Sequence, residues 1–176
     1  CVLMGTYLVM KGGWPIIIIG LASIFFAILY TAGPFALAYN GLGDFFVFLF
    51  FGLISTIGTI FLQAKSLSGM EFFFNNQFLI VLSSIAIGTL NTAILVVNNL
   101  RDYESDKLSR KNTIVVFFGK RFACYEYVFL LLINFISIVI IVLITRNYFF
   151  IPFLFISIFL SHNLTISIFN YDNINL

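Results

Sequence analysis

Charged residues are scarce in this chain: they make up nine per cent of its 176 residues, and histidine occurs once. The formal net charge of +2 provides no basic field that would attract a nucleic acid, so we expect no nucleic-acid partner. The two cysteines, Cys1 and Cys124, are too far apart for a zinc or redox motif, and we interpret them as small apolar fillers. The composition therefore argues against functions that depend on nucleic acid or on paired thiols.

Hydrophobic residues, in contrast, make up 61% of the chain, which is more than the core of a water-soluble protein of this length requires. We therefore predict an all-α integral membrane protein in contact with the lipid bilayer. The chain starts with Cys1 rather than Met and has no basic-then-apolar signal pattern. We interpret it as a fragment of a longer protein.

Long apolar runs predict where the chain crosses the membrane, because about 20 helical residues span the hydrocarbon core. Besides four complete runs, a fifth run begins near Tyr148 and becomes polar after Ser161. A short run at residues 2–10 looks like the end of a helix. We therefore expect about five spans and an N-terminal stub. The four complete runs are residues 14–30, 45–63, 78–97 and 124–144.

Basic residues set the predicted orientation. Six of the nine Lys and Arg residues lie in segment 98–123. The positive-inside rule places this segment in the cytoplasm. Counting back across two spans places the loop 31–44 on the same side, where its turn residues and apolar side chains predict an ordered structure. We therefore expect the two segments to form one cytoplasmic loop cap over the helix bundle.

The segment after the third complete run carries an acidic stripe. Asn98, Asp102 and Asp106 keep a four-residue period, so a continuous helix would place all three side chains on one face. Charged groups at a membrane surface are costly and are kept where they have a task. Carboxylate and amide oxygens suit Mg²⁺ holding a diphosphate, and Lys107, Arg110 and Lys111 follow closely enough to neutralise phosphate oxygens. The alternative is a solvated cytoplasmic helix of mixed charge.

Two sequence segments resemble a known family. Residues 98–106 read Asn-Asn-Leu-Arg-Asp-Tyr-Glu-Ser-Asp and are followed by Lys-Asn-Thr at 111–113 and by Gly119. This pattern resembles the second aspartate-rich motif of the UbiA superfamily of membrane prenyltransferases. The loop 31–44 and the tyrosine before it resemble the corresponding loop of the subfamily that prenylates 1,4-dihydroxy-2-naphthoate in menaquinone synthesis. The residues that carry this resemblance are Tyr-Thr-Ala-Gly-Pro at 30–34 and Tyr-Asn-Gly-Leu-Gly-Asp at 39–44.

The resemblance implies a fold, a cofactor and a metal site. The fold would be part of a UbiA-type transmembrane helix bundle, with residues 1–176 forming a single partial prenyltransferase domain. The cofactor would be Mg²⁺, and it would hold polyprenyl diphosphate, one of the two substrates. Asp102 and Asp106 would be the metal ligands and catalytic residues, with Asn98 or Asn99 assisting.

The resemblance also implies substrate contacts and a reaction. Lys111 matches a basic position of the motif and would contact the diphosphate, and Arg101, Tyr30 and Tyr39 are the other substrate-binding candidates. The metal and the cations would stabilise the leaving diphosphate while 1,4-dihydroxy-2-naphthoate attacks the prenyl chain. The product would be demethylmenaquinone, and the location the cell inner (plasma) membrane.

Three departures from the family pattern bear on activity. The family's first acidic motif corresponds to sequence upstream of Cys1, and the acids outside the stripe at 44, 71, 126 and 172 are isolated. Phe117 stands where the family commonly has Arg, and Arg110 where it commonly has Gly. We therefore expect the chain by itself to be inactive or to work only together with further segments.

Other functions remain open. A different aromatic acceptor, such as 4-hydroxybenzoate, a porphyrin or a chlorin, would need the same diphosphate chemistry. A CDP-alcohol phosphatidyltransferase also uses membrane aspartates four residues apart, but its Asp-Gly and Ala-Arg pairs are not present upstream. A transporter would require polar residues at mid-membrane depth, where Asn91 and Thr92 are the main candidates. The chain would otherwise be a non-catalytic membrane remnant of the enzyme.

Overall fold

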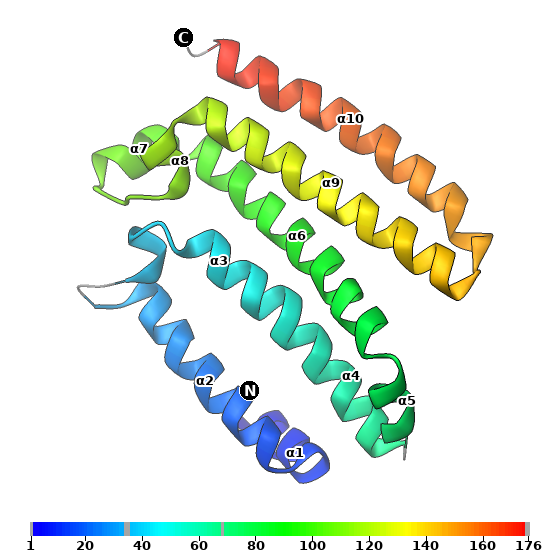
Figure 1. Ribbon diagram of the computed structural model, residues 1–176. Coiled ribbons are helices and arrows are strands. Elements are labelled where there is room, and N and C mark those ends of the chain that lie inside the picture. Colours follow the sequence, from blue (N-terminus) through cyan, green and yellow to red (C-terminus); the bar gives the residue numbers. More distant parts are fainter. Residues whose placement is uncertain (1, 34–35, 68, 175–176) are drawn as a thin grey trace.

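The computed structural model describes residues 2–33, 36–67 and 69–174, and this part of the chain is helical with no β-strand (Figure 1). Cys1 and Pro34, which entered the sequence interpretation, lie outside the described residues. The elements are α1 (Val2–Gly12), α2 (Trp14–Thr31), η1 (Leu37–Tyr39), α3 (Gly43–Val47), η2 (Phe48–Ile54), α4 (Ser55–Ser66), α5 (Met70–Asn75), α6 (Gln77–Arg101), α7 (Tyr103–Leu108), α8 (Ile114–Phe118), α9 (Lys120–Thr145), η3 (Tyr148–Phe150) and α10 (Ile151–Ile174).

Five helical segments in the described part are long and apolar enough to cross a membrane, which confirms the predicted number of spans. They are Trp14–Thr31, Gly43–Ser66, Gln77–Arg101, Lys120–Thr145 and Tyr148–Asn170. The helices extend beyond the apolar runs because polar and charged residues at their ends can reach water while the backbone stays helical. The predicted stub is α1, a helix of 11 residues.

The apolar run of the second span predicted a regular α-helix, but this span is irregular in the structure. Between α3 and α4, η2 is a π-helix of seven residues. At this point the span passes very close to α6: a Cβ added to Gly52 would lie 2.5 Å from the Cα of Gly88. Small residues permit such close backbone contact between membrane helices.

Helix α6 lies between its neighbours α9 and η2 and contacts both (Figure 1). Nδ2 of Asn134 on α9 donates a hydrogen bond of 2.8 Å to the carbonyl oxygen of Ala86 on α6, so a buried polar group joins the two spans. Asn91 and Thr92 instead donate to carbonyl oxygens of their own helix. This arrangement fits helix packing better than a polar transport path.

A hydrophobic cluster of residues from α6, α8 and α9 stabilises the end of the bundle at which α7 and α8 lie. It contains Ala93, Val96, Leu100, Val115, Ala123, Cys124, Tyr127 and Leu131. Cys124 is fully buried here, as expected for an apolar filler. Because Leu100 and Val115 belong to the same cluster, the polar segment between them is anchored at both ends.

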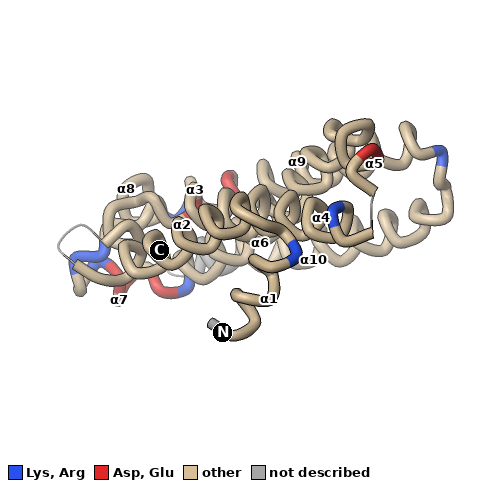
Figure 2. The backbone as a smooth tube through the Cα atoms, turned by 90° about the horizontal axis from the view of Figure 1, so that it is seen from below, with Lys and Arg blue, Asp and Glu red and all other residues tan. Residues whose placement is uncertain are grey.

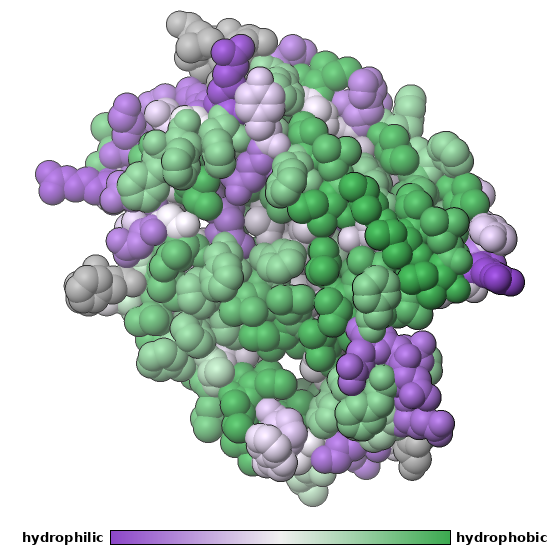
Figure 3. All heavy atoms as spheres, viewed as in Figure 1, coloured by the Kyte–Doolittle hydropathy of each residue, from purple (hydrophilic) through white to green (hydrophobic). Residues whose placement is uncertain are grey.

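Charged residues gather at the end of the bundle that carries α7 and α8, with few along the spans (Figure 2). Apolar side chains cover most of the face seen in Figure 3, as expected for a surface in contact with lipid. At the charged end, the backbone N–H of Asn112 donates to the carbonyl oxygen of Tyr39 at 3.1 Å, and Asn40 and Asn112 form a parallel bridge. The two loops therefore meet in one cap, as the span count predicted.

Candidate active site

The acidic segment forms a bend rather than one straight helix. Helix α6 ends at Arg101, Asp102 has φ −90° and ψ 8°, and α7 begins at Tyr103, so the prediction of an uninterrupted helix is wrong at Asp102. The hydroxyl of Ser105 donates to the carbonyl oxygen of Asp102 at 2.8 Å, a contact that bends helices. Even so, the N–H groups of Asp102 and Asp106 bond the carbonyl oxygens four residues earlier, so the four-residue spacing persists.

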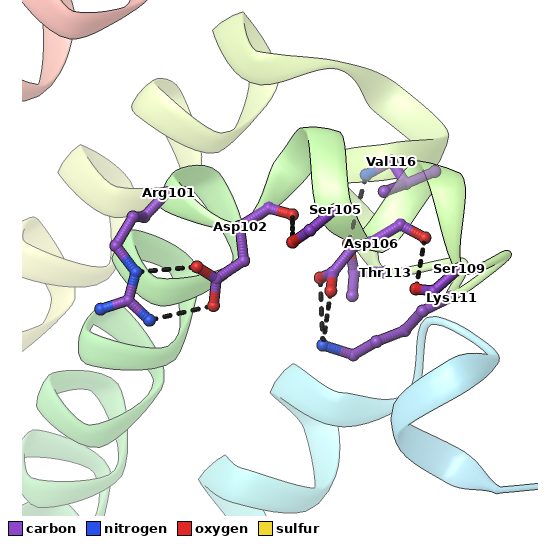
Figure 4. A network of polar contacts seen from close by, with 8 residues as sticks. All are labelled: Arg101, Asp102, Ser105, Asp106, Ser109, Lys111, Thr113 and Val116. Atoms are coloured by element: carbon purple, nitrogen blue, oxygen red, sulfur yellow. Dashed lines mark hydrogen bonds and ion pairs between the residues drawn. The ribbon is translucent and has the colours of Figure 1, made fainter.

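Asp102 lies on the exposed side of this bend and pairs with the preceding residue. Nε and Nη2 of Arg101 donate to its two carboxylate oxygens at 2.8 and 2.9 Å (Figure 4). These hydrogen bonds hold the pKa of the Asp102 carboxyl below its usual range, with further help from the charges of Arg101 and Lys111. Asp102 is therefore ionised at neutral pH, as a metal ligand must be.

Asp106 is buried, and its partner comes from the following turn. Nζ of Lys111 donates to Oδ1 and Oδ2 of Asp106 at 3.2 and 3.0 Å (Figure 4). The backbone explains this contact: the N–H of Lys111 bonds the carbonyl oxygen of Asp106, and the N–H of Arg110 bonds that of Lys107. These two bonds form a Schellman motif that ends α7 and turns Lys111 back toward Asp106.

The Schellman motif requires a left-handed residue at position 110. Arg110 has φ +57°, in a place where glycine is the usual choice because it has no Cβ. Backbone geometry therefore favours glycine at this position, in agreement with the pattern that the sequence resemblance implied. The turn forms with arginine nonetheless, so the departure does not displace Lys111 from Asp106.

Four of the predicted site residues line one small cavity at the charged end of the bundle, with a volume of about 230 Å³. Tyr30 comes from the end of α2, Tyr39 from η1, Asn99 from α6 and Lys111 from the loop before α8. The other lining residues are Thr31, Ala38, Gly43, Asp44, Leu95 and Thr113. Residues from both sequence motifs therefore meet around one space.

The other two substrate-binding candidates, Asn98 and Arg101, line a different space. They lie at the end of a groove of about 820 Å³ that runs between α6, α9 and α10. Its walls are mainly apolar, with side chains such as Ile94, Leu131 and Ile138. The apolar groove ends next to Asp102, whereas the small cavity shares Lys111 with Asp106.

The sequence interpretation missed Asp44, which it treated as an isolated acid. Asp44 is only 6% exposed and lines the small cavity from the first turn of α3. Its Oδ1 has no hydrogen-bond partner among the described residues. A signal was available, since a charged residue that opens an apolar run is costly and calls for an explanation.

Asp102 and Asp106 have the donor atoms that Mg²⁺ prefers, because both are carboxylates. In this structure the oxygens are paired with Arg101 and Lys111, which a metal ion would have to displace. Within the described residues, no group of three or more His, Cys, Asp or Glu side chains comes together as a metal site. A complete coordination shell would therefore need oxygens from the diphosphate, water or other segments. In donor chemistry the two acids fit Mg²⁺, as the second motif of the family implies.

Comparison with known proteins agrees with the motifs. The chain is similar to the 1,4-dihydroxy-2-naphthoate octaprenyltransferase of Escherichia coli, with 42% identity over 104 residues, which cover 59% of this chain and 31% of that protein. It is 30% identical over 120 residues to the protein of the same name from Bacillus subtilis, covering 68% of this chain and 36% of the relative.

Another relative is the UbiA prenyltransferase domain-containing protein 1 of Dictyostelium discoideum, with 32% identity over 112 residues, covering 58% of this chain and 31% of the relative. The matched segments thus span about a third of the length of each of these three relatives. No solved structure matches the chain closely enough to count as a relative. The sequence profile of the UbiA prenyltransferase family, however, matches residues 1–175, and the chain is a multi-pass membrane protein that belongs to this family.

Proposed function

We propose that this chain is part of a Mg²⁺-dependent prenyltransferase that transfers a polyprenyl chain from polyprenyl diphosphate to 1,4-dihydroxy-2-naphthoate. Prenyl transfer with loss of the carboxylate as carbon dioxide would leave the ring as the hydroquinone, demethylmenaquinol. A separate two-electron oxidation would then give demethylmenaquinone, an intermediate of menaquinone biosynthesis. The observation that carries the proposal is the meeting of the two motifs: Asp106 and Lys111 lie beside the cavity that Tyr30 and Tyr39 line from the other loop. The names of the bacterial relatives support the choice of acceptor.

The diphosphate would bind at the bend between α6 and α7. Asp102 and Asp106 would hold Mg²⁺, which when bound neutralises charge on the leaving diphosphate. Arg101 and Lys111 would turn from these acids toward the phosphate oxygens and stabilise the charge that develops as the allylic C–O bond breaks. Asn98 and Asn99, one turn before the bend, would provide further polar contacts.

The apolar groove between α6, α9 and α10 is suited to the isoprenoid tail. Its volume of about 820 Å³ lies in the range of ligand-binding sites, and its polar end, with Asn98 and Arg101, lies next to Asp102. An apolar wall excludes water that would otherwise react with the electron-poor chain. The ring of the acceptor would then attack the first carbon of the chain, and the ring carboxylate would leave as carbon dioxide.

The basic residues of segment 98–123 support an orientation with the cap in the cytoplasm. For a bacterial protein this places the spans in the inner (plasma) membrane, where diphosphate and naphthoate arrive from the cytoplasm and the tail remains in the lipid. The proposed location therefore agrees with the positions of the charged cap and the apolar groove.

A chimaera tests the function without assuming that the chain is active by itself. The matching segment of the Escherichia coli relative is replaced by this chain, and the chimaera is expressed in a strain that lacks its own enzyme. We expect demethylmenaquinone in the membranes. Asp102→Ala or Asp106→Ala should lower turnover by roughly 100-fold or more, because each removes a charge that stabilises the leaving group. Mass spectrometry of the quinones gives the readout.

Glu104→Ala provides the matched control. Glu104 lies between the two aspartates in sequence, but its side chain is 72% exposed and pairs with Lys120 at 3.2 Å. Exposed ion pairs contribute little, so we expect less than about a twofold change in turnover. The proposal is wrong if the chimaera keeps its activity with both aspartates replaced, or if prenyl transfer continues unchanged after Mg²⁺ has been removed with EDTA.

A further inference from the structure

The small cavity contains a carboxylate oxygen whose role the diphosphate chemistry does not explain. Asp44 is only 6% exposed, and its buried Oδ1 has no hydrogen-bond partner among the described residues. Buried polar atoms in native proteins are nearly always paired, and an unpaired one calls for a specific explanation. Because Asp44 lines the cavity, the simplest explanation is a ligand that binds there and supplies the missing hydrogen bond.

The chemistry of Asp44 limits what this ligand can be. An ionised carboxylate accepts hydrogen bonds and donates none, so the group that meets it must be a donor. A fully ionised phosphate has no proton to donate to this oxygen and would place negative charge directly against the acid, which is unfavourable. Glu126 Oε2 is the other unpaired buried oxygen in the described part, and the Glu126 carboxyl lies close enough to Asp44 to interact with it electrostatically, but Glu126 does not line this cavity.

The size and remaining walls of the cavity narrow the choice further. A volume of about 230 Å³ is below the usual range for extended ligands and is far too small for a polyprenyl tail. Tyr30 and Tyr39 supply aromatic surfaces, and Lys111 supplies a cation on the side of Asp106. A compact ring that carries both a hydroxyl and a carboxylate would match this combination of an acceptor, aromatic walls and a cation.

The cavity is also well placed for the reaction. Lys111 lines it and at the same time donates to both oxygens of Asp106, so one side chain belongs to the cavity and to the proposed diphosphate site. A ring held here would therefore lie next to the end of the prenyl chain that leaves the diphosphate. Transfer between two substrates requires such proximity.

We infer that this cavity binds the aromatic acceptor and that Oδ1 of Asp44 accepts a hydrogen bond from a ring hydroxyl, which selects a hydroxylated ring. The inference rests on the proposed function for the identity of the acceptor. It adds a residue that determines specificity and that is separate from the proposed metal-binding pair Asp102 and Asp106. Asp44 is a binding residue in this scheme, because it contacts the substrate directly.

Equilibrium binding tests the inference on the chain as it is. The purified 176-residue chain is placed in lipid nanodiscs and titrated into a solution of the ligand, and the quenching of the ligand's fluorescence is measured. Mg²⁺ and prenyl diphosphate are left out, and the conditions are anaerobic. The probes are 1,4-dihydroxy-2-naphthoate and 2-naphthoate, which lacks both hydroxyls. We expect the unaltered chain to bind the hydroxylated ring roughly 10- to 100-fold more tightly, as hydrogen bonds to charged groups allow.

Asp44→Asn separates this role from a purely structural one. The substitution keeps the shape of the side chain and removes its charge, and we expect the preference for the hydroxylated ring to fall to less than about threefold while 2-naphthoate binds as before. Because the substitution also removes an unpaired buried charge, the unfolding temperature of the ligand-free chain should stay the same or rise. Glu104→Gln, an exposed acid of the same cap, is the control and should change neither value.

Gly43→Ala tests the location of the site without touching the acid. A Cβ at this position would lie 3.3 Å from the Tyr30 hydroxyl and 3.6 Å from a Leu95 methyl, so it narrows the cavity. Binding of the naphthoate should weaken at least about tenfold. The inference is wrong if the unaltered chain shows no saturable binding, if Asp44→Asn keeps the full preference for hydroxyls, or if it weakens both ligands equally.

The outcome is distinguishable from a failure of the proposed function. Hydroxyl-dependent binding that is lost in Asp44→Asn, together with a chimaera that transfers no prenyl chain, would sustain the ring site and refute the transferase. In the opposite case, an active chimaera whose KM for the naphthoate is unchanged by Asp44→Asn would sustain the transferase and refute the ring site. If both proposals hold, Asp44→Asn should raise the KM for the naphthoate and leave that for the prenyl diphosphate unchanged.

Discussion

At position 110 a left-handed turn is built with arginine, and the turn is what brings Lys111 to Asp106. A residue with a Cβ in this conformation costs about 1–2 kcal/mol of strain, which glycine would relieve. Part of that gain is offset because glycine has greater conformational freedom in the unfolded chain. We therefore expect Arg110→Gly to raise the free energy of unfolding by up to about 1 kcal/mol. The measurement is thermal unfolding of the chain in detergent, with and without the substitution.

The control for this prediction lies three residues earlier. Lys107 lies in the last turn of α7, where the backbone is still α-helical, so Lys107→Gly should lower the free energy of unfolding by up to about 1 kcal/mol, because glycine favours helix less than lysine does. Opposite signs for the two glycine substitutions would identify backbone conformation as the cause. Equal signs would mean that loss of an arginine or lysine charge dominates and that the turn is not strained.

Residues that belong to a motif were easier to find than residues defined by packing. The spacing of Asp102 and Asp106 and the basic position of Lys111 are visible in the sequence, and the structure brings Lys111 onto Asp106. Asp44 was overlooked because its burial depends on how α3 packs below the loop and beside α6, which no local pattern shows. The same holds for the pairing of Asp102 with Arg101 rather than with Lys111.

Among the helices, the backbones of η2 and α6 approach each other very closely where the two cross. A Cβ on Gly52 would lie 2.5 Å from the Cα of Gly88 and 3.0 Å from the carbonyl oxygen of Ser84, and backbone atoms cannot give way as a flexible side chain can. Gly52→Ala should therefore lower the free energy of unfolding by about 1–3 kcal/mol, the usual cost of overpacking. Reversible unfolding in mixed micelles provides the measurement.

Gly58 on α4 is the matched control for this crossing. It belongs to the same span, but a Cβ there would meet nothing within 4 Å in the described structure. Gly58→Ala should be neutral or slightly stabilising, because alanine favours helix more than glycine does. If Gly58→Ala proved as destabilising as Gly52→Ala, close helix contact would not be the reason.

The elements themselves followed largely from hydrophobic length. A run of about 20 apolar residues has few alternatives to a spanning helix, so the five spans were predictable with small errors at their ends. The bend at Asp102 and the π-helix of Phe48–Ile54 were not predictable, because the length of an apolar run marks neither. Ser105 bonds the carbonyl oxygen at the bend, and η2 packs against α6.

For the molecule as a whole, the joined cap fixes which ends of the spans share one side of the membrane. The sequence predicted this arrangement from the number of spans between the two loops, and the contact between Asn112 and Tyr39 confirms that the loops meet. Which compartment the cap faces is a separate matter, which rests on the basic residues. Thiol labelling answers both questions in one experiment.

The labelling uses single cysteines in a chain carrying Cys1→Ser and Cys124→Ala. Asn40 and Leu108 are exposed in the cap, and Asn147 is exposed in the turn between α9 and η3 at the other end of the spans. A membrane-impermeant maleimide should label Asn40→Cys and Leu108→Cys in inverted vesicles, where the cytoplasmic face is outside, and Asn147→Cys in intact spheroplasts. Labelling of the two cap positions from opposite sides would contradict the fold. Labelling of both only in spheroplasts would keep the fold and reverse the proposed orientation, leaving the acids on the side from which a cytoplasmic diphosphate does not arrive.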